Sequence, residues 1–130
     1  MPLVRIAFEG EGSPERRRAV GDAVHRALVA TAGVPEDDLF QMIESFAPGA
    51  IRWSPTYLGV DRRGPAVFVQ VFLNLGRTLE VKAALYAAVA GELRKEGFRV
   101  EDVLVNLVEV PRENWSFGGG VMSYPPAPQR

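Results

Sequence analysis

The chain repeats itself at half its length, and this internal repeat limits the possible folds more than any other feature. The stretch PEDDLFQMIE (residues 35–44) resembles VEDVLVNLVE (residues 100–109) at a separation of 65 residues. The same separation aligns PLVRIAF (residues 2–8) with VFVQVFL (residues 67–73). Similarity at a fixed separation indicates a structural unit that is used more than once. The fold is therefore expected to contain two copies of one small unit.

The length and composition are those of one folded domain. The chain has 130 residues, of which 47% are hydrophobic and 24% charged, as in globular rather than disordered proteins. We predict a single domain over residues 1–130, with repeat units at 2–46 and 67–110. The proline-rich end, residues 124–130, is predicted to be a mobile tail.

Each unit has the pattern of a strand, a helix and a second strand. Between its two strands, each unit carries apolar residues at helical spacing, which predicts one helix per unit. Ser13 and Thr78 are suitable N-caps, and Gly33 and Gly97 lie where the helices are expected to end. Short stretches rich in β-branched and aromatic residues predict four strands, namely Leu3–Phe8, Leu39–Glu44, Val67–Leu73 and Val103–Glu109.

The predicted fold class is α/β (α+β). Two right-handed βαβ units side by side give a four-stranded mixed sheet with two helices on one face. The strands are apolar on both sides, with Val67 and Val69 facing one way and Phe68 the other. The uncovered face predicts self-association, because large exposed apolar patches mark interfaces. Residues 48–65 and 114–124 are predicted to form edge strands there.

Charge and composition exclude several classes of function. The net charge of −1 argues against a broad nucleic-acid-binding surface. The chain has no cysteine and one histidine, His25, so disulfides, thiol chemistry and most catalytic triads are excluded. We find no metal-ligand spacing, no apolar run near the ~20 residues of a membrane span, and no signal peptide. We therefore expect a cytoplasmic protein without metal, membrane or nucleic-acid partners.

Four stretches together resemble the tautomerase superfamily and, within it, the malonate semialdehyde decarboxylase group. They are PLVRI directly after Met1, GVPEDDLFQ (residues 33–41), GRTLEVKAALY (residues 76–86) and NWSFGGG (residues 114–120). The resemblance covers almost the whole chain. It implies a homotrimer with active sites between neighbouring subunits, a small carboxylic-acid substrate and no cofactor. It also implies an N-terminal proline that is exposed when Met1 is removed.

Pro2 is the first candidate catalytic residue, because a free N-terminal proline is a secondary amine. An ordinary α-amino group titrates at about 7.7–8.0. Burial lowers the pKa of such an amine, and a nearby carboxylate raises it. The surroundings therefore decide whether Pro2 acts as a general base or a general acid near neutral pH. The alternative is that Pro2 is merely a small residue that permits removal of Met1.

Two charged residues each occur in only one of the aligned units. Asp38 aligns with Val103, and Arg77 aligns with a glycine. The resemblance implies that Asp38 holds a water or helps to set the pKa of the amine, and that Arg77 binds a substrate carboxylate or polarises its carbonyl. The alternatives are a turn residue and a solvent-facing loop arginine. Asp37, which aligns with Asp102, fits the role of a turn residue better.

Four further residues are candidates for contact with substrate. Trp115 and Phe117 are expected to form an apolar wall around the amine, or alternatively to fasten the C-terminal segment to the core. His25 either reaches the pocket or is a hydrogen-bonded core residue. Phe40 either lines the pocket or only packs against its neighbours.

This chain departs from the decarboxylase group at one position, and the departure changes the activity that we predict. The decarboxylase group has a second arginine two residues after the first, where this chain has Leu79. The loss of that cation favours keto–enol tautomerisation of a small 2-oxo acid, which requires only one base and one cation. Decarboxylation or hydration of a three-carbon acid is the first alternative. A non-enzymatic trimeric signalling or structural protein is the second.

Overall fold

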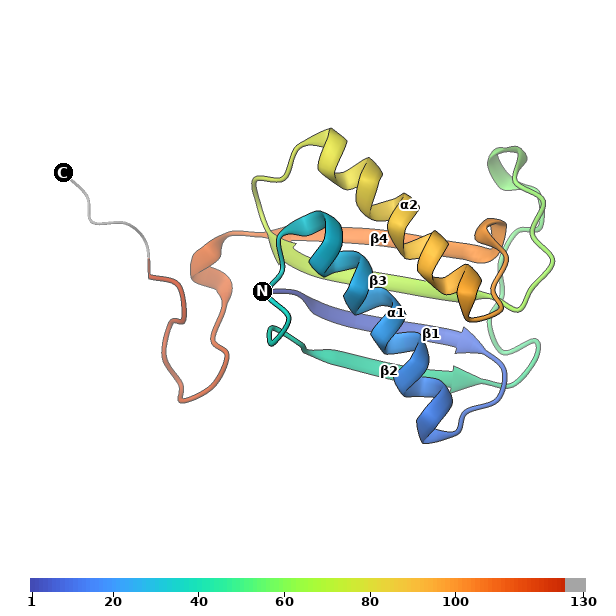
Figure 1. Ribbon diagram of the computed structural model, residues 1–130, viewed down its shortest axis with the longest axis horizontal. Helices are drawn as coiled ribbons and strands as arrows, with labels where there is room; N and C mark the ends of the chain where they lie inside the picture. The colour runs from blue at the N-terminus through green and yellow to red at the C-terminus, as the bar shows by residue number, and fades with distance from the viewer. Residues whose placement is uncertain (126–130) are drawn as a thin grey trace.

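The computed structural model describes residues 1–125, which form one mixed sheet covered by two helices (Figure 1). The sheet order is β2-β1-β3-β4, in which β1 and β2 are parallel, β3 and β4 are parallel, and β1 and β3 are antiparallel. Each parallel pair with its helix is one βαβ unit, as predicted. The elements are β1 (Leu3–Glu9), α1 (Pro14–Ala32), β2 (Gln41–Phe46), β3 (Val67–Asn74), α2 (Leu79–Lys95) and β4 (Val103–Val110).

The helices begin and end where the sequence predicts. The Ser13 side chain accepts a hydrogen bond from the backbone N–H of Arg16 at 3.1 Å. The Thr78 side chain accepts one from Val81 at 3.2 Å. Both bonds satisfy amides that have no partner within the first helical turn. After α1, Gly33 has a φ of 70°, a left-handed conformation that glycine adopts at little cost.

Strand β2 lies two residues later than predicted. Its prediction over Leu39–Glu44 rests on apolar content, but Leu39 and Phe40 are largely exposed and precede the ladder. Pairing begins at Val4 with Gln41, since β1 itself begins only one residue earlier. The end of the neighbouring strand, rather than local composition, therefore sets the start of β2.

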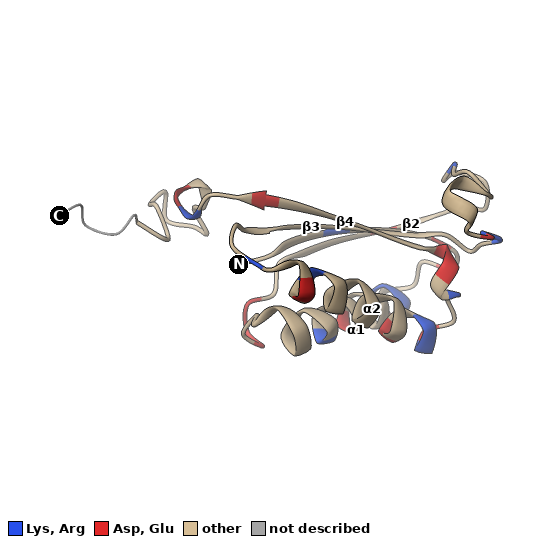
Figure 2. Ribbon diagram, turned by 90° about the horizontal axis from the view of Figure 1, so that it is seen from above, with Lys and Arg blue, Asp and Glu red and all other residues tan. Residues whose placement is uncertain are grey.

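The core lies between the sheet and the two helices, which cover the same face (Figure 2). Val20 of α1 and Leu85 of α2 are fully buried and lie 65 residues apart, as the repeat predicts. After the helices the separation changes. Val34 and Phe98, the first buried residues beyond each helix, are only 64 residues apart. The second unit is therefore one residue shorter between its helix and its second strand.

This shortening changes the structural counterpart of Asp38. The backbone N–H of Asp38 donates to the carbonyl of Pro35 at 3.1 Å, and that of Asp102 donates to the carbonyl of Arg99 at 2.9 Å. These are the same turn at a separation of 64 residues. The predicted alignment of Asp38 with Val103 is wrong, because it ignores the missing residue. Asp38 corresponds to Asp102, so both units carry an aspartate at this position.

The sheet face opposite the helices is uncovered in the single chain (Figure 2). The two segments predicted to supply edge strands, residues 48–65 and 114–124, contain no strand. The hydrogen bonds of residues 48–65 are mostly local, such as the turn from Arg62 to Pro55 at 3.1 Å, and its prolines cannot donate to a ladder. The predicted tail begins with Tyr124, which contacts the Arg112 guanidinium at 4.9 Å, and residues 126–130 lie outside the described part.

Candidate active site

The chain begins at the end of the sheet where β3 and β4 finish (Figure 1). The amino group of Met1 forms an ion pair with the carboxylate of Asp38. Pro2 follows directly and is buried. The turn between Pro35 and Asp38 places the carboxylate beside the start of β1, because β2 runs parallel to β1. Two predicted catalytic residues, Pro2 and Asp38, are thus brought together with the amino terminus.

Asn74 is a third residue at this end, which the sequence analysis missed. It ends β3 and is only 4% exposed. The indole N–H of Trp115 donates to Asn74 Oδ1 at 2.6 Å, and Asn74 Nδ2 contacts the sulfur of Met1. An asparagine that follows an apolar strand and precedes a glycine within two residues is typical of a turn. Its burial depends on Met1 and Trp115, which are remote in sequence.

Arg77 connects the ends of two elements beside this group. Its Nε and Nη2 donate to the carbonyl of Ala32 at 3.2 and 2.8 Å, and Nη1 donates to the carbonyl of Asn74 at 3.2 Å. Ala32 is the last residue of α1, where the helix dipole favours a cation. A guanidinium has five N–H donors, so these three bonds leave two for a ligand.

The surroundings lower the basicity of the amino terminus. Burial first, and the positive charge of Arg77 second, lower the pKa of the Met1 amine from 8.0 to about 6. The carboxylate of Asp38 acts in the opposite direction, since it stabilises the cation. The protonation state of an amine at this place therefore depends on the balance between burial and Arg77 on one side and Asp38 on the other.

Aromatic side chains form one wall next to the amine. The rings of Trp115 and Phe117 stack at 5.0 Å between centroids, and Phe40 packs on Phe117 at 5.0 Å. They lie around a hollow of about 370 Å³ that Leu3 also lines. Trp115, Phe117 and Phe40 thus form one aromatic cluster, and its predicted role as a wall around the Pro2 amine stays a prediction. Whether these residues contact a substrate stays a prediction.

His25 and Leu79 lie outside this group. The Nε2 of His25 is 2.8 Å from the carbonyl oxygen of Glu36, two residues before Asp38. His25 therefore ties α1 to the turn that carries the aspartate. Leu79 opens α2 and is 83% exposed, so no structural requirement explains a leucine there.

Two family models, both described as "Tautomerase enzyme", match the chain over residues 38–118 and 2–60. The first alone covers more than half of the sequence. This chain belongs to the tautomerase family. The resemblance stated from the sequence is confirmed, and with it the prediction of a tautomerase-superfamily enzyme.

Individual relatives agree with the family models over nearly the full length of this tautomerase. "Probable tautomerase YusQ" of Bacillus subtilis (strain 168) is 34% identical over 92% of the chain and 95% of the relative. The crystal structure of FG41 malonate semialdehyde decarboxylase inhibited by 3-bromopropiolate is 37% identical, with a TM-score of 0.86 over 94% of this chain and 93% of that one. A fused 4-OT wild-type symmetric trimer shares the fold, with a TM-score of 0.77 at 24% identity over 93% and 95% of the two chains.

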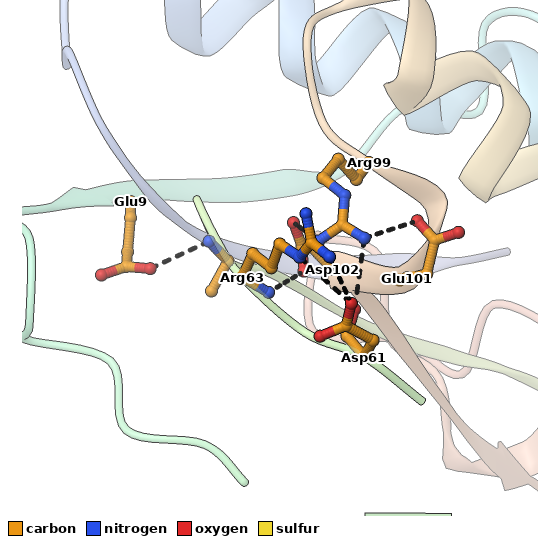
Figure 3. Close-up of polar contacts among 7 residues, drawn as sticks. Glu9, Asp61, Arg63, Arg99, Glu101 and Asp102 are labelled. Atoms are coloured by element: carbon orange, nitrogen blue, oxygen red, sulfur yellow. Dashed lines mark hydrogen bonds and ion pairs between the residues drawn. The ribbon is translucent and has the colours of Figure 1, made fainter. Parts of the chain in front are cut away.

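At the opposite end of the sheet of this tautomerase, the counterparts of Asp38 and Asn74 bind backbone N–H groups instead of an amino terminus (Figure 3). Asp102, the counterpart of Asp38, is 1% exposed and accepts a hydrogen bond from the backbone N–H of Arg63 at 2.9 Å. Glu9, the counterpart of Asn74, accepts hydrogen bonds from the backbone N–H groups of Ala66 at 2.9 Å and Gly49 at 3.0 Å. Here the two polar positions hold the backbone that leads into β3.

Residues 1–125 contain neither a cluster of potential metal ligands nor a membrane-spanning helix. This part of the chain has no group of three or more His, Cys, Asp or Glu side chains placed to bind a metal ion. No helix within it has the length and apolar character needed to span a bilayer.

Proposed function

We propose that this enzyme catalyses keto–enol tautomerisation of a small 2-oxo acid, without a cofactor, once Met1 has been removed. The Pro2 nitrogen takes a proton from the carbon next to the carbonyl. The C–H electron pair becomes the carbon–carbon double bond of the enolate, and the carbonyl electrons move to oxygen. The reverse sequence returns the proton to carbon and converts the enol to the ketone. Arg77 binds the carboxylate, and Asp38 adjusts the basicity of the amine.

The observation that carries this proposal is the group of Asp38, Asn74 and Arg77 around the amino terminus, where burial and the charge of Arg77 lower the pKa of an amine. The pKa of the Met1 amine is lowered to about 6, and Pro2 is the next residue inward. A base is most effective when its pKa lies near the working pH. This supports a neutral proline that accepts a proton.

We further propose that three copies assemble through the uncovered sheet face, in the cytoplasm. Phe68 and Leu104 lie on that face, and Met42 of the edge strand β2 is 49% exposed. Solved structures of the same fold include trimers. In such an assembly a neighbouring copy closes the open side of the aromatic wall, which excludes water from the amine.

The test is ketonisation of phenylenolpyruvate, followed by ultraviolet absorbance, with protein shown by mass spectrometry to lack Met1. Pro2→Ala is expected to lower kcat/KM by at least about 100-fold, since general base catalysis contributes about 10²–10⁴-fold. Pro14→Ala is the matched control, because Pro14 is exposed at the first turn of α1. Full activity of Pro2→Ala refutes the proposal.

Decarboxylation of a three-carbon acid is the second candidate, favoured by the likeness to malonate semialdehyde decarboxylase. Leu79 stands where that group has its second arginine, and its exposure leaves room for the larger side chain. Turnover of malonate semialdehyde by the wild type and by Leu79→Arg distinguishes the two. Wild-type turnover that matches or exceeds phenylenolpyruvate ketonisation favours the decarboxylase.

A further inference from the structure

Asn74 lies between the amino terminus, Trp115 and Arg77, yet the proton transfer proposed above gives it no part. The Trp115 indole N–H occupies its Oδ1 at 2.6 Å. This bond fixes the orientation of the amide, because an indole N–H donates only. The Nδ2 group must then point the other way, where it contacts the sulfur of Met1. Asn74 is thereby held as a hydrogen-bond donor directed at the place that Met1 fills.

Removal of Met1 leaves that donor without its partner, next to the Pro2 nitrogen. The thioether of Met1 is only a weak acceptor. A donor in a cleft that a bound ligand closes off from water requires an acceptor, so the freed amide favours a ligand with a strong one. A carbonyl or enolate oxygen is such an acceptor. A small molecule that reaches both Pro2 and Asn74 occupies about the space of the Met1 residue.

Comparison with the opposite end of the sheet shows why an asparagine, rather than a carboxylate, suits the amine end. The counterpart of Asn74 is Glu9, a carboxylate that accepts two backbone N–H bonds. At the amine end, a carboxylate would repel an anionic acid and raise the pKa of the amine. A neutral amide that donates does neither. The difference between Glu9 and Asn74 therefore suits a site that binds an acid and keeps its amine unprotonated.

We propose that Asn74 donates a hydrogen bond from Nδ2 to the carbonyl oxygen of the 2-oxo acid and stabilises the enolate that forms when Pro2 removes the proton. Trp115 is a positioning residue, which keeps the amide in the donating orientation. Arg77 is then free to bind the carboxylate with its remaining N–H groups. This inference rests on the proposed tautomerase function and adds the group that receives the developing charge.

The kinetic test compares Asn74→Leu, Trp115→Phe and the double variant in phenylenolpyruvate ketonisation. Loss of one donor to a developing oxyanion lowers kcat about 10²–10³-fold. Asn74→Leu is therefore expected to lower kcat about 100-fold with little change in KM. Trp115→Phe should lower kcat about 10-fold, and the double variant should be no slower than Asn74→Leu. Tyr86→Phe, at an exposed tyrosine of α2, is the control and should retain wild-type kcat.

Asn74→Asp supplies a readout that a merely structural role would not move. The aspartate still accepts from Trp115, but its charge raises the pKa of the amine, so the acidic limb of the pH–rate profile moves to higher pH. An unchanged profile overturns the proposal. The proposal is also overturned if Asn74→Leu keeps kcat within about threefold of wild type. It is overturned as well if the double variant loses the product of the two single losses in kcat, since Trp115 would then act independently of Asn74.

A binding measurement separates this inference from the proposed function. In Met1-free protein, 2-oxobutanoate is expected to shift the NMR signals of the Asn74 side-chain amide and the Trp115 indole N–H. Asn74→Leu should weaken that binding. If phenylenolpyruvate is not turned over but these shifts occur, the oxygen-binding role stands and the tautomerase reaction fails. If 2-oxobutanoate binds without moving either signal, the role of Asn74 is refuted.

Discussion

Replacement of Asp102 tests whether this buried aspartate anchors the backbone at the end of the sheet opposite the amino terminus. Asp102 is 1% exposed, accepts the Arg63 backbone N–H at 2.9 Å and lies 3.6 Å from the guanidinium of Arg99. Within residues 1–125, neither Asp102 Oδ2 nor Arg99 Nη1 has a hydrogen-bond partner. The carboxylate is therefore held by one charge and one backbone donor. Asp37 is exposed in the other unit and supplies the control.

The size of the effect follows from these contacts. Two unit charges at this separation attract by about 4–5 kcal/mol at an effective dielectric constant of 20. Arg99 is about a third exposed, so water screens part of this attraction. Removal of one partner of a buried pair costs about 3–5 kcal/mol. We expect a loss of about 3 kcal/mol for Asp102→Ala and about 1–2 kcal/mol for Asp102→Asn, which keeps an acceptor for Arg63.

The measurement is urea unfolding at one protein concentration, because assembly makes apparent stability depend on concentration. Asp37→Asn and Asp37→Ala should lie within about 0.5 kcal/mol of wild type, as is usual for exposed sites. A loss in Asp102→Asn no larger than in Asp37→Asn refutes the account of the opposite end as a buried anchor.

Two further predictions concern the amine end. Protein that retains Met1 should gain stability as pH rises from about 6 to 8, because the pKa of its amine falls from 8.0 to about 6 on folding and the unfolded chain then binds more protons. Urea unfolding between pH 6 and 8 measures this gain in protein with a free Met1 amino group and in protein whose amino group is acetylated. If stability depends on pH equally steeply in both forms, the prediction is wrong. His25→Ala should lose about 1 kcal/mol through the lost bond to Glu36 and His25→Gln less, by the same measurement. Equal losses would show that the ring is not held by that carbonyl.

The fold was predictable from the sequence because each of its determinants is local. Helix caps at Ser13 and Thr78, alternating strands and one repeat separation are sufficient for two βαβ units. One of the errors, the counterpart assigned to Asp38, came from a single missing residue after α2. Such a shift leaves the apolar pattern unchanged, but it makes Asp102, rather than Val103, the structural counterpart of Asp38. A comparison of hydrogen-bonded turns detects it, whereas a comparison of residue types does not.

The candidate site was only partly predictable, because its members come from distant parts of the chain. Pro2, Asp38 and Arg77 were identified through the resemblance to a family. Asn74 carries no signal of its own, since its orientation depends on a tryptophan 41 residues later. The buried, oriented amide of Asn74 results from contacts with Trp115 and Met1, so it arises only when these three segments come together in the folded chain.

The repeat also explains why the proposed site lies at one end of the sheet and not at both. At the start of the first strand of each unit lie the aspartate of that unit and a polar residue that ends the first strand of the other unit. In the first unit the chain begins there, so Asp38 and Asn74 meet an amino group that can exchange a proton. In the second unit the chain continues, so Asp102 meets a peptide N–H, which does not titrate near neutral pH. The position of a chain end therefore decides which of two equivalent positions can carry acid–base chemistry, and the other is left to stabilise the fold.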